Sequence, residues 1–297
     1  MTEPRGSSIK KPPWLRVPLP GAGAFAEVKT RLRKNGLVTV CTEASCPNLA
    51  ECWAHGTLTV MILGDVCTRN CRFCDVRHAG DEEPNAACGP PDPDEPEKVA
   101  RVLGELGMRY AVLTSVTRDD LPDGGAAHWA AVIGAVSAAC PAVEALVPDF
   151  GGNLDAVDVV LAAAPTVFAH NIETVRSLSP EIRPMADYDR SLVVLAHAAA
   201  SGIPVKSSLL LGLGETHEEI LVTLRDLRAA GVARVTLGQY LAPSRTHVAV
   251  KRFLSPGEFD MLRAEALEMG FSAVHSGPLV RSSYHAHTMA GPCGSSR

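Results

Sequence analysis

Short apolar runs recur along most of the 297-residue chain at intervals of a few tens of residues, and helical patterns separate them. Seven runs of this kind are predicted to be strands: TLTVMIL (57–63), RYAVLTS (109–115), VEALVPD (143–149), TVFAHN (166–171), PVKSSLLL (204–211), ARVTLGQY (233–240) and SAVHS (272–276). Strands that alternate with helices indicate a parallel sheet with right-handed crossovers. Six or seven such units match a full or partial β/α barrel, in which the chemistry collects at the carboxyl ends of the strands.

Two of the intervening helices carry N-terminal capping signals. Thr216 and Glu219 have the spacing of a capping box and precede an apolar face at helical intervals. Ser255 and Glu258 repeat this spacing, and Pro256 occupies the first helical position. These signals predict that two helices begin directly after Thr216 and Ser255.

Composition excludes several classes of protein. The net charge is −5 and there is no basic block of the kind that grips phosphate backbones, so we expect no nucleic-acid partner. No apolar run reaches the roughly 18 residues of a membrane span, and we expect no membrane partner. The N-terminus lacks the apolar stretch of a signal peptide, which favours a cytoplasmic protein. In that reducing compartment, nine cysteines indicate metal binding or catalysis rather than disulfides.

Six of the nine cysteines form two triplets at loop-compatible spacing, which is typical of thiolate ligands: Cys41, Cys46 and Cys52, then Cys67, Cys71 and Cys74. The second triplet, CTRNCRFC, directly follows the first predicted strand and therefore lies at the functional end of a barrel. One interpretation is a Cys₃His zinc site completed by His78, and the first triplet with His55 would suit another zinc knuckle. Cys88, Cys140 and Cys293 match no ligand motif.

The C-x₃-C-x₂-C spacing, with Phe73 before the last cysteine, resembles the signature of the radical S-adenosylmethionine superfamily. The resemblance implies that Cys67, Cys71 and Cys74 hold three irons of a [4Fe–4S] cluster. Its fourth iron would chelate the amino and carboxylate groups of S-adenosylmethionine, and reduction would release a 5′-deoxyadenosyl radical.

Beside this motif, Cys41-x₄-Cys46-x₅-Cys52 resembles the auxiliary-cluster motif of the lipoyl synthase family. Further stretches resemble that family in its order, over roughly residues 10 to 290: GDVCTRNCRFCDV, LTSVTRDDLPDGGA, LVPDFGG, HNIETV, LLLGLGET, GQYLAPS and SGPLVRSSYHA. Position 72 is Arg, where the lipoyl synthase family usually has Pro. The resemblance implies that Ser283, in Arg281-Ser282-Ser283-Tyr284, completes a second [4Fe–4S] cluster with the first triplet. From the residues alone, these serines would cap a turn equally well.

The resemblance also implies a fold and a reaction. The fold would be a partial (β/α)₆-type barrel over 57–270, with an N-terminal extension over 1–56 and a C-terminal strand and tail over 271–297. The reaction would insert two sulfur atoms, at C6 and C8 of an octanoyl-lysine on a lipoyl carrier domain or a glycine-cleavage H protein. The second cluster would be the sulfur donor, and a ferredoxin or flavodoxin would supply electrons. A biotin-synthase-like enzyme, a methylthiotransferase and a non-catalytic zinc protein are the alternatives.

Polar residues near the predicted strand ends are candidates to bind S-adenosylmethionine: Thr114, Ser115, Asp119, Asn171, Glu173, Arg183 and Lys206. Structural roles compete for three of them. Glu173 suits the first turn of a helix, Arg183 a surface ion pair, and Lys206 a solvated strand end.

Overall fold

The computed structural model describes residues 10–16, 28, 30–40, 48–54, 56–79 and 88–289. Cys41, Cys46, His55 and Cys293, on which the sequence analysis drew, lie outside the described residues.

A seven-stranded parallel sheet forms the centre of the fold, and each strand pairs with the next along the chain. The strands are β1 (Thr57–Ile62), β2 (Tyr110–Ser115), β3 (Val143–Leu146), β4 (Val167–Ala169), β5 (Val205–Leu211), β6 (Arg234–Gln239) and β7 (Ala273–Gly277). All seven predicted strands are confirmed, although β3 ends three residues earlier than expected. Within the described sheet β1 and β7 do not pair, so the barrel is partial, as predicted.

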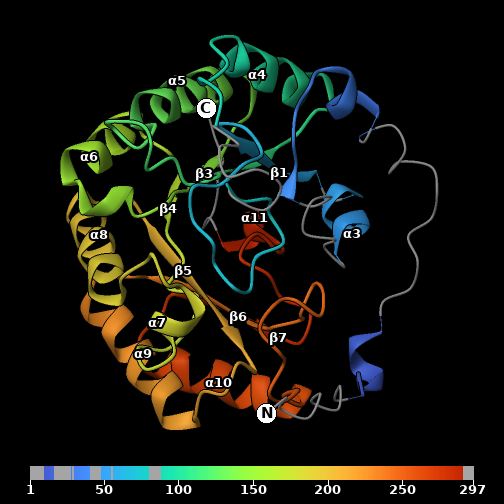
Figure 1. Ribbon diagram of the computed structural model, residues 1–297, viewed down its shortest axis with the longest axis vertical. Coiled ribbons are helices and arrows are strands. Elements are labelled where there is room, and N and C mark those ends of the chain that lie inside the picture. The colour runs from blue at the N-terminus through green and yellow to red at the C-terminus, as the bar shows by residue number, and fades with distance from the viewer. Residues whose placement is uncertain are drawn as a thin grey trace, which may run out of the picture.

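Helices cover the outside of this arc of strands (Figure 1). They are α4 (Glu95–Glu105), α5 (Ala126–Ala139), α6 (Leu154–Ala162), α7 (Ser179–Ile182), α8 (Tyr188–Ala200), α9 (His217–Ala229) and α10 (Pro256–Glu268), with the 3₁₀ turn η2 (Phe150–Gly152) before α6. Both predicted capping boxes are present, at Thr216 and at Ser255. Their reciprocal hydrogen bonds satisfy backbone groups that each helix start would otherwise leave unpaired.

Segments near both ends of the described chain pack against the partial barrel. The 3₁₀ turn η1 (Pro13–Leu15) and α3 (Leu49–Ala54) precede β1, and Met61 N donates to Val38 O (2.9 Å) across an antiparallel bridge. The short α11 (Ala286–Met289) lies within the arc of strands (Figure 1). The expected boundary at 270/271 falls inside one sheet, because β7 pairs with β6.

Every residue of β1 and β6 is buried, so these strands are covered on both faces, whereas β7 is mostly half-buried. One face packs against the helices, and the other encloses the interior of the barrel. Near the amino ends of the strands, this interior holds a buried polar group of Tyr110, Glu144 and Lys206. Ala286 of α11 packs against Tyr110 there, so α11 closes this end.

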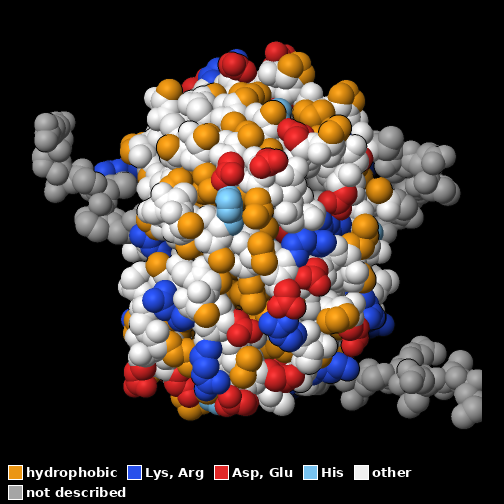
Figure 2. Space-filling view, turned by 90° about the vertical axis from the view of Figure 1, so that its left-hand side faces the viewer, with side chains coloured by type: hydrophobic (Ala, Val, Ile, Leu, Met, Phe, Trp, Pro, Cys, Tyr) orange, Lys and Arg blue, Asp and Glu red, His pale blue; other side chains and the backbone are white. Residues whose placement is uncertain are grey.

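The outer face of α6, α8 and α9 mixes charged and apolar side chains (Figure 2). Val159, Val193 and Val222 are its exposed large apolar residues, one on each helix. Single exposed valines are ordinary on a protein surface. None of the described helices combines the length and the apolar character needed to traverse a bilayer.

Candidate active site

A cavity of about 510 Å³ lies at the carboxyl ends of the strands. This volume is in the range of small-molecule and cofactor sites. Nine of the predicted site residues line it: Cys67, Cys71, Cys74, Thr114, Ser115, Asn171, Glu173, Arg183 and Ser283. The thiol triplet after β1 and the serine turn after β7, more than 200 positions apart, therefore share one cavity.

Backbone hydrogen bonds shape the loop that carries the three thiols. Cys67 N donates to Arg77 O and Ala79 N donates to Cys67 O, both at 2.9 Å, which brings the two ends of the loop together. Cys74 N donates to Cys71 O at 3.0 Å, which makes a tight turn between the last two thiols. Two backbone amides, those of Arg69 (3.4 Å) and Thr117 (3.3 Å), donate to the Cys67 sulfur. The loop is thus built by its own backbone and by the segment after β2.

The thiols in this loop are costly to ionise without a cation. Burial raises the pKa of Cys71 to about 11 and that of Cys74 to about 12. Bound iron would offset this cost, because metal ligation requires the thiolate. Within the described ranges, no three His, Cys, Asp or Glu side chains converge as ligands of a single ion. A four-iron cluster differs from zinc here, since each cysteine binds a separate iron.

His78, the fourth ligand of the zinc interpretation, is not among the residues of the main cavity. It lines a second hollow, which Cys71 and Cys74 also line. Its Nδ1 lies 3.0 Å from Val76 O. This placement does not favour a Cys₃His site.

Two buried polar atoms at the main cavity have no hydrogen-bond partner in the structure as described: Ser115 Oγ and Arg183 Nε. Arg183 is buried, and its Nη1 donates to Ile172 O at 2.9 Å. It forms no surface ion pair with any of the described residues. Unpartnered buried polar atoms are costly, and a ligand with carboxylate and hydroxyl groups would satisfy both.

Asn171 and Glu173 also face this cavity. Asn171 Nδ2 donates to Glu173 Oε1 at 2.9 Å. Glu173 has a φ of 65°, a left-handed conformation that is strained for this residue, and such strain collects at functional sites. Burial raises the pKa of Glu173, and the Arg183 charge opposes the shift. Glu173 does not begin a helix, so the first-turn role considered for it does not apply.

Lys206, also expected near the cofactor, is not among the residues that line the cavity. It is the second residue of β5, at the end of the strand away from the site. Its Nζ lies 2.7 and 3.0 Å from the two carboxylate oxygens of Glu144, and both side chains are 1% exposed. Lys206 is therefore half of a buried ion pair and not a solvated strand-end charge.

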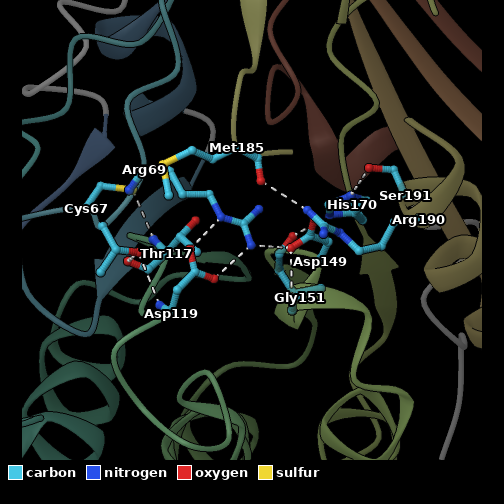
Figure 3. Close-up of polar contacts among 12 residues, drawn as sticks. Cys67, Arg69, Thr117, Asp119, Asp149, Gly151, His170, Met185, Arg190 and Ser191 are labelled. Carbon is cyan, nitrogen blue, oxygen red and sulfur yellow. Dashed lines mark hydrogen bonds and ion pairs between the residues drawn. The ribbon is translucent and has the colours of Figure 1, made fainter. Parts of the chain in front are cut away.

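Asp119 also lies outside the lining of this cavity, and its carboxylate accepts from Arg69 Nε at 2.7 Å and from Arg69 Nη2 at 2.8 Å (Figure 3). Arg69 also reaches Asp149, at 2.7 Å from Nη2. Neither Arg69 nor Asp149 was a predicted site residue. The available signal was a basic residue between two thiol ligands.

His170, another residue at the cavity, has both ring nitrogens engaged. Its Nδ1 donates to Val147 O (2.9 Å), and its Nε2 lies 3.0 Å from Ser191 Oγ. Burial lowers the pKa of His170 to about 4, so the ring is neutral near pH 7. Both ring nitrogens are therefore held by groups of the protein itself.

The serine turn is attached to the segment that carries Cys52. Tyr284 Oη donates to both carboxylate oxygens of Glu51, at 3.2 and 3.3 Å, and His285 Nε2 lies 2.9 Å from Glu51 Oε1. Glu51 is the neighbour of Cys52 on α3. Burial and the Glu51 carboxylate raise the pKa of Tyr284 to about 12, which keeps its hydroxyl a donor. The contacts bring the turn of Ser283 close to the third thiol of the first triplet.

Comparisons with known proteins agree on the family. The model of the Radical SAM superfamily matches residues 61–227. The lipoyl synthase of Thermus thermophilus is 55% identical over 281 residues, covering 93% of this chain and 85% of that protein. The lipoyl synthase of Methylococcus capsulatus is 52% identical over 290 residues, covering 96% and 88%.

Solved structures show the fold alone. Streptococcus suis SuiB bound to S-adenosylmethionine superposes with a TM-score of 0.56 at 13% identity, covering 82% of this chain and 56% of that one. Methylornithine synthase (PylB) gives 0.52 at 14% identity, covering 84% and 81%. The family match spans more than half of the chain, and relatives above 50% identity span nearly all of it. The chain therefore belongs to the lipoyl synthase family of the radical S-adenosylmethionine superfamily.

Proposed function

We propose that this chain is a lipoyl synthase that inserts sulfur at C6 and C8 of a protein-bound octanoyl-lysine. The observation that supports the proposal most directly is the single cavity lined by both Cys67, Cys71 and Cys74 and the turn of Ser283. Sulfur insertion needs a radical generator and a sulfur donor on either side of one carbon chain, and a shared cavity meets that requirement.

Cys67, Cys71 and Cys74 would hold the first [4Fe–4S] cluster, and Ser115, Asn171, Glu173, Arg183 and Thr114 would hold S-adenosylmethionine beside it. When bound, these groups supply hydrogen-atom abstraction from an unactivated carbon. Among the described residues that line the cavity, Arg183 Nε and Ser115 Oγ are the buried donors without a partner, so they are the strongest candidates for contacts with the carboxylate and hydroxyl groups of the cofactor.

The auxiliary cluster is a substrate in this proposal, because it gives up its sulfur. Cys41, Cys46, Cys52 and Ser283 would bind it. Val40, the described residue before Cys41, lines the cavity, and Glu51 connects the Cys52 helix to the serine turn. An alkoxide ligand leaves more readily than a thiolate once it is protonated, so Ser283 suits a cluster that must be dismantled.

The cavity is also lined by apolar side chains that fit an aliphatic chain: Val40, Met61, Leu146, Leu210 and Leu241. We propose that the carrier is an octanoylated lipoyl domain or glycine-cleavage H protein, that a ferredoxin or flavodoxin supplies electrons, and that the reaction takes place in the cytoplasm. The family in general requires a carrier substrate and a reductant, and the identities of the carrier and of the electron donor are proposed for this chain.

The test is anaerobic reconstitution followed by incubation with S-adenosylmethionine, dithionite and an octanoyl-lysyl peptide. We expect roughly eight irons per chain, in two four-iron clusters, and a dithiolated peptide by mass spectrometry. Ser283→Ala should lower the yield about tenfold or more, because it removes a ligand of the sulfur donor, whereas Ser282→Ala serves as the matched control. Wild-type protein that makes no thiolated product, or a yield unchanged by Ser283→Ala, would refute the assignment.

A further inference from the structure

Arg69 lies between two of the thiol ligands, yet its side chain points away from solvent. The side chain is 6% exposed and makes three charge-assisted contacts of 2.7 to 2.8 Å, two with Asp119 and one with Asp149 (Figure 3). Asp119 follows β2 and Asp149 follows β3. One guanidinium therefore joins the thiol loop after β1 to the loops after the next two strands.

Asp149 is itself held from several sides. It has no exposed surface, Arg190 Nε of α8 lies 2.8 Å from its Oδ2, and Gly151 N donates to its Oδ1 at 3.0 Å. Arg190 Nη2 in turn donates to Met185 O at 3.1 Å. Burial opposes ionisation of Asp149, but the Arg69 contact holds its pKa well below the usual range. The anion is thus fixed in place, and Arg69 binds to a rigid partner.

The contacts of Arg69 bear directly on the Cys67 sulfur. The two amides that donate to this sulfur belong to Arg69 itself and to Thr117, two residues before Asp119. Thr68 reinforces the same junction: its N and its Oγ1 both donate to Thr117 O at 3.0 Å, and its Oγ1 accepts from Asp119 N at 3.1 Å. The Arg69–Asp119 pair therefore joins the two segments from which both N–H···S bonds come.

Arg72, in the same loop, provides a comparison. It also lies between two thiol ligands, but its side chain is 51% exposed and pairs only with Glu181, which is 61% exposed. An exposed pair of this kind contributes about 0–1 kcal/mol. Burying an arginine side chain costs free energy unless the charge is fully paired. The contacts of Arg69 with Asp119 and Asp149 offset this cost.

We propose that Arg69 is a positioning residue that holds the Cys67 end of the cluster loop against the segments after β2 and β3 and so tunes the potential of the first cluster. The proposal rests on the proposed function, because it assumes a cluster at these thiols. Donors to a ligating sulfur and nearby positive charge both stabilise the reduced, more negative cluster. Losing Arg69 removes the charge, loosens both amide donors, takes the cationic partner from Asp119 and leaves Asp149 paired with Arg190 alone.

The experiment compares Arg69→Met and Arg69→Lys with the matched control Arg72→Met, in the full chain reconstituted anaerobically. The midpoint potential of the first cluster is measured by an EPR-monitored redox titration, and the signal that changes on addition of S-adenosylmethionine identifies this cluster. We expect Arg69→Met to lower the one-electron equilibrium constant for reduction about tenfold, which is about 59 mV. Arg69→Lys keeps the charge but not the planar fork, so its shift should be smaller. Arg72→Met should shift the constant less than about twofold.

Equal potentials in wild type, Arg69→Met and Arg69→Lys would overturn the proposal, even with a lowered melting temperature, since a purely structural residue changes stability alone. If Arg69→Met fails to bind iron at this site, Arg69→Lys is the deciding variant: a lowered potential supports positioning, and an unchanged one refutes it. The titration needs no carrier substrate. Failure of the proposed function would instead appear as wild-type protein with a normal potential and no thiolated product.

Discussion

Lys206→Met tests the buried ion pair in the barrel. The substitution removes an ammonium that lies 2.7 and 3.0 Å from the two oxygens of Glu144 and leaves that carboxylate buried. Breaking a buried pair by removing one partner costs about 3–5 kcal/mol of unfolding free energy, far more than the 0–1 kcal/mol of a surface pair. Tyr110 Oη still donates to Glu144 at 2.9 Å, so we expect a value near the lower limit, about 3 kcal/mol.

Thermal unfolding of the reconstituted protein under anaerobic conditions measures this effect. A loss of about 3 kcal/mol corresponds to a fall in melting temperature of roughly 6–12 °C. The double variant Glu144→Gln/Lys206→Met should recover part of the loss, because no uncompensated charge remains. Affinity for S-adenosylmethionine should stay at the wild-type level. A variant that melts like wild type but binds the cofactor weakly would refute the reasoning and return Lys206 to the active site.

Two further substitutions and one pH dependence test other parts of the structure. Glu51→Ala should reduce the iron content of the auxiliary cluster and leave the first cluster intact, because it removes the carboxylate that connects the Ser283 turn to the Cys52 helix. Iron analysis with Mössbauer spectra measures the iron content of each cluster. Gly238→Ala should lower the melting temperature and the auxiliary iron, since a methyl group there collides with the backbone carbonyl that precedes Arg281. His170 has a pKa of about 4 in the folded state and is neutral at pH 7. Its contribution to stability is therefore complete above about pH 6.5 and is lost as the pH falls towards 4. Urea titrations should give a free energy of unfolding that is about 2 kcal/mol lower at pH 5 than at pH 7 because of this group.

Each of these has a matched control. Glu51→Gln keeps one acceptor oxygen and should retain most of the auxiliary iron. An equal loss of iron in both Glu51 variants would show that the contacts of Glu51 with Tyr284 and His285 do not hold the Ser283 turn. Gly257→Ala adds a methyl group in open space within α10 and should not destabilise the protein; if Gly238→Ala behaves the same way, the steric argument is wrong. In His170→Gln the loss of unfolding free energy between pH 7 and pH 5 should be smaller than in wild type. An equal loss in both proteins would assign this pH dependence to other groups.

Local patterns in the sequence were enough to predict the framework. The strands were recognisable because each is a short apolar run with its own boundaries, and the capping boxes at Thr216 and Ser255 depend only on residues three positions apart. The thiol triplet after β1 follows from the same logic, since the loop after a barrel strand opens at the functional end. The place of Ser283 needed the resemblance of a whole motif, because two serines in a turn carry no signal of their own.

Tertiary structure alone decided which polar side chains reach the cavity. Lys206, Ser208 and Leu210 share one face of β5, but only the latter two lie high enough along the strand to line the site. The partner of Lys206 is 62 positions away, and that of Asp119 is 50 positions away. No local pattern records such pairings, because they arise only when the curvature of the sheet brings separate loops and layers together. The sequence therefore predicted which groups would ligate iron, and the packing of distant segments determined how those groups are held.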